Sequence, residues 1–215
     1  MTRLGVNIDH VATVRNARGS FHPDPFTIAK HVTKCGAHSV TIHLREDRRH
    51  IKDADVIKIC KNKKIITNLE ISLNKKIINI ALKNRPNFIC IVPEKRKEVT
   101  TEGGLNLIKN KKKIKTIISS FNKKNIRTSL FVDPTLKDIK IAKELNATCV
   151  ELHTGKISNL VKENKNYKNE YLRIKKCSML GVKLGIEVHA GHGLDYKTTS
   201  IPVSYTHLRA HETTS

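Results

Sequence analysis

Residues 41–50 read TIHLREDRRH, a short apolar run followed at once by charged and titratable side chains. His43 lies in this stretch, Glu70 ends the next apolar run, and His192 follows a later one. An imidazole titrates near neutral pH, and burial raises the pKa of a carboxyl group toward the same range. These three side chains therefore predict general acid–base catalysis.

Arginine side chains gather close to these proton carriers. Their guanidinium groups hold phosphate oxygens through charge-assisted hydrogen bonds, and a glycine- and threonine-rich segment adds backbone donors. The arginines and that segment, EKRKEVTTEGG at 94–104, predict a cationic rim that binds a small phosphorylated substrate. The arginines are Arg15, Arg18, Arg45, Arg48 and Arg49.

Each of these residues also has a purely structural interpretation. A histidine at a strand end can be a hydrogen-bonded core residue, Glu70 can pair with the arginines, and a glycine can simply make a turn. HAGH at 189–192 places two histidines three residues apart, but on a strand and turn this spacing does not face both imidazoles to one ion. This spacing therefore predicts no metal site.

The elements that carry these residues alternate regularly. Continuous apolar, β-branched runs are typical of parallel strands covered on both faces. Amphipathic segments with helix signals lie between them, as where Asp24 caps a helix that begins at Pro25. This order predicts parallel βαβ units, in a doubly wound sheet or a barrel. The seven predicted strands are 4–8, 39–44, 65–71, 88–92, 128–132, 148–152 and 183–188.

Polar residues at the strand ends separate these two architectures. No G-x-G-x-x-G follows the first strand, as a dinucleotide-binding sheet would require. Nearly every strand instead ends in polar side chains, and in a barrel those ends converge on the face that carries the active site. We therefore predict an α/β fold, a TIM (β/α)8 barrel. The strand-end residues are Asn7, Asp9, His10, His43, Arg45, Asn68, Glu70, Glu94, Asp133, Glu151, His153, His189 and His192.

The charge balance allows a second class of function. Lys and Arg number 41 against 19 Asp and Glu, a net charge of +22 that could attract nucleic acid. The lysines are mixed with Asn and Ile, however, as on solvated helix surfaces, and aromatic residues make up only 4%. We therefore expect no nucleic-acid partner and keep a basic RNA-binding protein as the lesser alternative.

Cysteine usage and hydropathy indicate the compartment. The five cysteines form no C-x-x-C pair, which suggests neither a disulfide framework nor a zinc site. The N-terminus has no apolar signal region, and no run approaches the roughly 20 residues that span a bilayer. These features predict a soluble, cytoplasmic protein with no membrane partner.

Six stretches together closely resemble the pyridoxine 5'-phosphate synthase family: GVNIDHVATVRNARG (5–19), TIHLREDRRHI (41–51), NLE (68–70), VPEKRKEVTTEGG (92–104), ELHTG (151–155) and AGHGLDY (190–196). The resemblance implies a TIM-barrel enzyme of vitamin B6 biosynthesis. It would condense 1-deoxy-D-xylulose 5-phosphate with 3-amino-2-oxopropyl phosphate into pyridoxine 5'-phosphate, phosphate and water. It also implies no metal or cofactor and a symmetric homo-oligomer.

The resemblance implies a role for each matching residue. His43 and Glu70 are expected to act as general bases, His192 as the proton donor and Glu151 as a transition-state stabiliser. Another phosphosugar-handling TIM barrel, an isomerase or aldolase, remains the main alternative. The deoxyxylulose phosphate is expected to contact Asp9, His10, Arg45, His50 and Thr100, and the amino-ketone phosphate Asn7, Arg18 and Gly193.

The family pattern breaks after Ile201. The remaining residues, PVSYTHLRAHETTS, contain no apolar strand, and most of them match the translation of a sequencing-library adapter. We therefore expect a catalytic domain at 1–201 and a non-native tail at 202–215. The barrel would then have about seven βα units, with the eighth missing and the edges of the first and seventh strands open.

Overall fold

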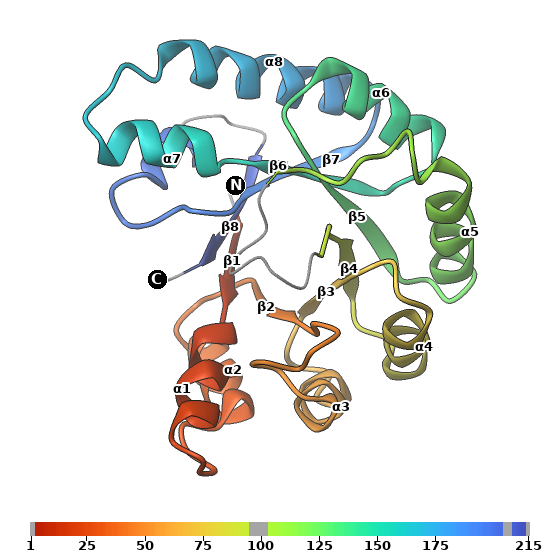
Figure 1. Ribbon diagram of the computed structural model, residues 1–215, viewed down its shortest axis with the longest axis vertical. Coiled ribbons are helices and arrows are strands. Elements are labelled where there is room, and N and C mark those ends of the chain that lie inside the picture. The colour runs from red at the N-terminus through yellow and green to blue at the C-terminus, as the bar shows by residue number, and fades with distance from the viewer. Residues whose placement is uncertain (1–2, 95–102, 204–207, 214–215) are drawn as a thin grey trace.

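The computed structural model describes residues 3–94, 103–203 and 208–213. Within them, parallel strands form a closed barrel in the order β1 to β8, surrounded by helices (Figure 1). The predicted TIM-barrel class is therefore confirmed. The strands are β1 (Leu4–Asn7), β2 (Ser39–His43), β3 (Thr67–Ile71), β4 (Phe88–Ile91), β5 (Arg127–Val132), β6 (Cys149–His153), β7 (Glu187–Gly191) and β8 (Leu208–Thr213).

Some of the helices begin where a capping side chain accepts hydrogen bonds from their first N–H groups. The Asp24 side chain accepts hydrogen bonds from the N–H groups of Phe26 and Thr27, and the Asn74 side chain accepts one from Lys76. The Asp24 cap agrees with the sequence-based prediction. The helices are α1 (Asp9–Ala17), α2 (Pro25–Lys34), α3 (Asp53–Lys61), α4 (Lys75–Asn84), α5 (Lys111–Asn122), α6 (Leu136–Glu144), α7 (Gly155–Lys162), α8 (Lys168–Lys183) and α9 (Ser200–Val203).

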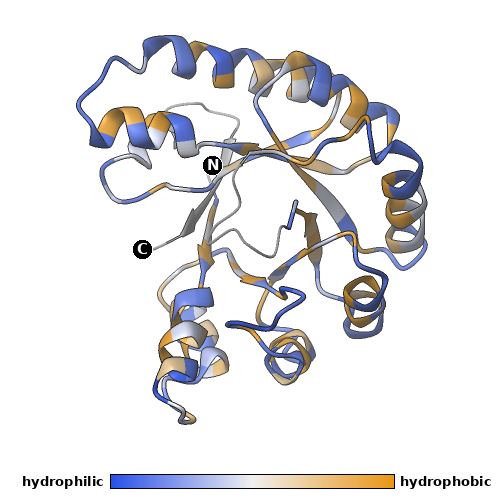
Figure 2. Ribbon diagram, in the orientation of Figure 1, coloured by the Kyte–Doolittle hydropathy of each residue, from blue (hydrophilic) through white to orange (hydrophobic). Residues whose placement is uncertain are grey.

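The main core lies between the strands and the helices. Ile42, Leu69 and Ile89 on neighbouring strands are fully buried, together with Ile77 and Ile114 from the helices around them. Figure 2 shows apolar and polar residues on the same helices, as expected when one side packs on a barrel and the other meets water. This core fixes the strands whose carboxyl ends carry the predicted site.

The seventh strand differs from its predicted position at 183–188. Helix α8 continues to Lys183, Gly185 takes a φ of +70°, and β7 then runs from Glu187 to Gly191. The apolar residues just before the glycine belong to the last turn of the helix. A left-handed backbone, which glycine adopts without steric cost, separates the two elements.

The end of the chain differs from the expected open edges. Seven strands are each followed by a helix, as the sequence predicts, but residues 208–213 form β8, which pairs with both β7 and β1. No helix follows β8 within the residues described. The edges of β1 and β7 are therefore covered, and the eighth unit consists of a strand alone. The division of the chain at residue 201 stays a prediction.

In the part of the chain that the structure describes, none of the helices combines the length and the apolar character that a membrane span requires.

Candidate active site

His43 and Glu70 are brought together at the carboxyl ends of two paired strands. The barrel register places His43 on β2 opposite Glu70 on β3, and His43 Nδ1 lies 3.5 Å from Glu70 Oε2. Burial, together with the nearby carboxylates of Glu151 and Asp9, raises the pKa of Glu70 well above its ordinary value. The pair thus combines an imidazole with a carboxylate that takes up a proton more readily than a solvated one.

Glu151 lies on β6 and faces the same barrel interior. Its Oε2 accepts a hydrogen bond from the Cys90 thiol on β4 at 3.7 Å, a contact that passes across the intervening strand β5. Burial raises the pKa of Glu151 to about 7 and raises that of the Cys90 thiol as well. Because two nearby carboxylates in a buried site cannot both ionise cheaply, Glu70 and Glu151 each take up a proton more readily than a solvated carboxylate does.

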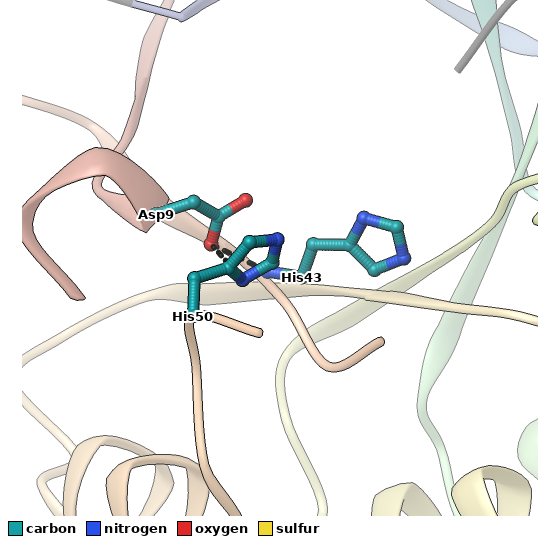
Figure 3. A group of neighbouring side chains, drawn as sticks. All are labelled: Asp9, His43 and His50. Carbon is teal, nitrogen blue, oxygen red and sulfur yellow. Dashed lines mark hydrogen bonds and ion pairs between the residues drawn. The ribbon is translucent and has the colours of Figure 1, made fainter. Parts of the chain in front are cut away.

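Asp9 connects the end of β1 to the histidines of the neighbouring strand and loop. Its Oδ1 accepts a hydrogen bond from the His43 backbone N–H at 2.9 Å and lies 3.9 Å from His50 Nδ1 (Figure 3). Asn7 donates its amide to Asp9 Oδ2 at 3.1 Å, and its own oxygen accepts the Asp9 N–H at 2.8 Å. Burial lowers the pKa of His50, which favours its neutral form.

Asp9, His43 and His50 have ligand atoms that a metal ion could use. One ligand atom each from Asp9, His43 and His50 lie within 4.8 Å of one another. Asp9 Oδ1 already accepts the His43 backbone N–H, however. This hydrogen bond positions the end of β2 without an ion. The expected absence of a metal remains a prediction.

His192 and Gly193 follow β7 on another side of the barrel mouth. His192 has a φ of +78°, held where the Thr154 hydroxyl donates to the carbonyl oxygens of Gly191 and His192. Its ring centroid is 4.9 Å from that of His153. Burial and the adjacent His153 lower the pKa of His192 to about 4, so its imidazole is neutral at pH 7.

The arginines of the predicted rim lie in different surroundings. Arg15 is buried and forms two hydrogen bonds with Asp55, at 2.6 and 2.9 Å, so its interpretation as a phosphate ligand is wrong. Two further arginines pair with neighbouring carboxylates: Arg48 with Asp53, and Arg49 with Asp47. For Arg48 and Arg49, the short sequence distance to an opposite charge already indicates such a pair.

The structure places the remaining predicted residues in different parts of the molecule. Arg45 is buried beside the acid–base pair, whereas His10 and Arg18 are exposed, on α1 and just after it. Thr100 lies outside the described residues. His189, expected among the strand-end residues, lies instead near the amino ends of the strands, where its Nε2 is 2.7 Å from Glu187.

That opposite end of the barrel holds a second group of possible metal ligands, Cys149, Glu187 and His189. The Arg127 guanidinium forms an ion pair with Glu187 and lies 3.6 Å from Cys149 Sγ. A protein cation thus already neutralises the carboxylate. A cavity of about 580 Å³ adjoins this group, lined among others by Arg3, His38, Arg127 and His189.

A closed parallel barrel with buried carboxyl and imidazole groups at the carboxyl ends of its strands defines an enzyme of the TIM-barrel class. Comparison with known families shows to which family of such enzymes the chain belongs. The family model described as pyridoxal phosphate biosynthesis protein PdxJ matches residues 4–211. The chain belongs to this family, and it is therefore an enzyme of vitamin B6 biosynthesis.

Curated relatives agree with this assignment. Pyridoxine 5'-phosphate synthase of Pelagibacter ubique is 92% identical over 201 residues, which cover 94% of this chain and 84% of that protein. The enzymes of the same name from Zymomonas mobilis and Rhodospirillum rubrum are 48% and 46% identical, over 94% and 91% of this chain and 78% of each relative.

A solved structure supports the fold. The 3-keto-L-gulonate-6-phosphate decarboxylase of Vibrio cholerae superposes with a TM-score of 0.68 at 12% identity, covering 99% of this chain and 88% of that one. At this low identity the likeness concerns the barrel alone.

Proposed function

We propose that the chain condenses 1-deoxy-D-xylulose 5-phosphate with 3-amino-2-oxopropyl phosphate to give pyridoxine 5'-phosphate, inorganic phosphate and water. The observation that carries this proposal is the contact between His43 and Glu70, 3.5 Å apart, beside the protonatable Glu151. Family membership supports it, since the relatives are named for the same product. No metal or organic cofactor is required for these proton transfers.

The protonation states suit a reaction with several proton transfers. Joining an amine to a ketone, expelling water and phosphate, and closing an aromatic ring each move protons. In this proposal His43 and Glu70 accept protons from the substrates, and Glu151 supplies a carboxyl group able to stabilise developing charge. His192 donates a proton to a leaving group, once a bound phosphate dianion offsets the burial that keeps its imidazole neutral.

Binding of two phosphorylated substrates requires cationic and backbone donors. Arg45 and His50 border the His43 side of the site, with Asp9 available to hydroxyl groups, and we assign them to the deoxyxylulose phosphate together with His10 and Thr100. Asn7, Arg18 and Gly193 are assigned to the amino-ketone phosphate. Gly193 has a φ of +77°, and an added Cβ would lie 3.3 Å from Gly155 Cα, so a side chain there is disfavoured.

Juxtaposition of the two substrates is itself a large part of this catalysis. Holding two small reactants in a productive arrangement can lower a barrier by about 7–11 kcal/mol. The net charge of +22 favours the approach of two phosphate dianions that repel each other. A cytoplasmic homo-oligomer remains part of the proposal.

Glu70→Gln tests the assigned chemistry. The amide keeps the size of the side chain but cannot take up a proton, so we expect kcat to fall by about 10²- to 10⁴-fold with folding retained. Formation of pyridoxine 5'-phosphate from both substrates is followed by chromatography, and folding by circular dichroism.

Glu144→Gln is the matched control. Glu144 is an exposed carboxylate at the end of α6 that pairs with Lys111, and its substitution should leave turnover unchanged. Equal turnover of the parent chain and Glu70→Gln would refute the role of Glu70. A different product from the parent chain would refute the proposed reaction.

A further inference from the structure

Glu94 follows β4 and lies within the site, although no role follows for it from the sequence alone. Its side chain is only 3% exposed. Glu94 Oε1 accepts the Glu46 N–H at 2.9 Å and lies 3.9 Å from Arg45 Nη2, whereas Oε2 lies 3.8 Å from His43 Nε2. A buried carboxylate is thus directed toward the ring nitrogen of His43 that does not face Glu70.

Three buried polar atoms meet at this point without hydrogen-bond partners among the described residues: His43 Nε2, Arg45 Nη2 and Glu94 Oε2. Buried polar groups in folded proteins are nearly always hydrogen-bonded, because an unsatisfied one costs about 1–3 kcal/mol. Catalytic hydrogen bonds are often long before substrate binds and shorten in the complex. A closure of about 1 Å would join His43 Nε2 to Glu94 Oε2.

The two carboxyl groups beside His43 differ in their preferred charge. The pKa of Glu70 is raised by burial and by neighbouring carboxylates. Burial also opposes ionisation of Glu94, but His43, the Glu46 N–H and Arg45 together outweigh it and lower the pKa of Glu94. Glu94 is therefore the ionised hydrogen-bond acceptor of the two, and Glu70 is the one that carries a proton readily.

We propose that Glu94 is a positioning residue that accepts the Nε2–H of His43 and so fixes the imidazole in the tautomer whose Nδ1 lone pair faces Glu70. This deepens the proposed function and rests on it, since it identifies Nδ1 as the atom of His43 that takes a proton. The proton moves from the substrate to Nδ1 and is later returned, while the Nε2–H bond stays intact and Glu94 balances the imidazolium charge.

Nitrogen-15 NMR of histidine-labelled protein without substrate tests the tautomer directly, with the His43 signals assigned by their loss in His43→Gln. At about pH 8 the parent chain should show a protonated Nε2 and an unprotonated Nδ1. In Glu94→Gln both tautomers should be populated, because an amide offers a donor as well as an acceptor. Glu94→Asp keeps the charge and should retain the parental tautomer.

Kinetics supply the second readout. Glu94→Gln should lower kcat by about 10²-fold, the lower end of general acid–base effects, with a smaller change in KM. Glu46→Gln is the matched control, because its carboxylate accepts the Ser72 hydroxyl and not His43, and it should leave the tautomer unchanged.

A parental spectrum with Nδ1 protonated would overturn the inference, as would an unchanged tautomer in Glu94→Gln. Neither result depends on turnover. Loss of the proposed condensation in the parent chain would instead refute the function and leave the spectra interpretable.

Discussion

Buried carboxyl groups are the residues that most directly connect the site to measurable behaviour. Glu151 is buried on β6, and its pKa of about 7 lies above the ordinary 4.5 because its charged form is poorly solvated there. Between pH 4.5 and about pH 7, Glu151 therefore binds more protons in the folded chain than in the unfolded chain. The free energy of unfolding therefore falls as the pH rises through this interval.

Glu151→Gln should remove this dependence. We expect the stability of the parent chain to decline relative to the variant between about pH 5 and pH 7, by up to about 1.4 kcal/mol per pH unit. Urea unfolding at several pH values measures the difference, with Glu144→Gln as the exposed control that should follow the parent. Parallel pH profiles for the parent and Glu151→Gln would show that burial does not perturb this carboxyl group.

The sequence predicts many of these residues but not their partners. His43, Glu70 and Asp9 could be identified because polar side chains that end apolar strands converge in a parallel barrel. The contact from Cys90 to Glu151 could not, because it joins strands that are not neighbours and depends on the curvature of the barrel. Glu94 was recognised only as a strand-end residue, since its contact with His43 depends on side-chain direction.

Among the elements, α1 is held against the start of α3 by a buried ion pair. Arg15 forms two hydrogen bonds with Asp55 and one with the His50 carbonyl oxygen, at 3.2 Å. Asp55 also accepts the Lys52 N–H at 2.8 Å. This pair therefore supports the loop that carries His50 into the site.

Asp55→Asn should destabilise the fold markedly, because it leaves the buried Arg15 charge without a counterion. We expect a loss of about 3 kcal/mol in the free energy of unfolding, measured in urea. Asp53→Asn, in the same helical turn, breaks a more exposed pair with Arg48 and should cost under about 1 kcal/mol. Equal losses in both variants would contradict the distinction between the two pairs.

The helices and strands themselves were largely predictable, with one informative exception. Asp24 caps its helix as the sequence indicates, because an Asp followed by Pro and an amphipathic run is typical of a helix start. The position of β7 was not predictable, because the apolar residues before Gly185 fit the end of a helix as well as a strand.

At the scale of the whole molecule, β8 completes the barrel by pairing with β1 and β7. A chain that ends at Ile201 would expose the backbone edges of both strands, which are templates for association. We expect such a chain to form larger species than the parent at equal concentration, as measured by sedimentation velocity. Identical sedimentation of the two chains would show that β8 does not protect these edges.

Pairing of β1 with β8 sets Leu4 opposite Ala210, so the barrel joins nearly the first residues of the chain to nearly the last. A ribosome releases the first strand long before the last has been synthesised. The nascent polypeptide must therefore carry an unclosed barrel until β8 has emerged, and such contacts between distant segments form slowly. Until β8 pairs with β1 and β7, molecular chaperones have an exposed edge to bind.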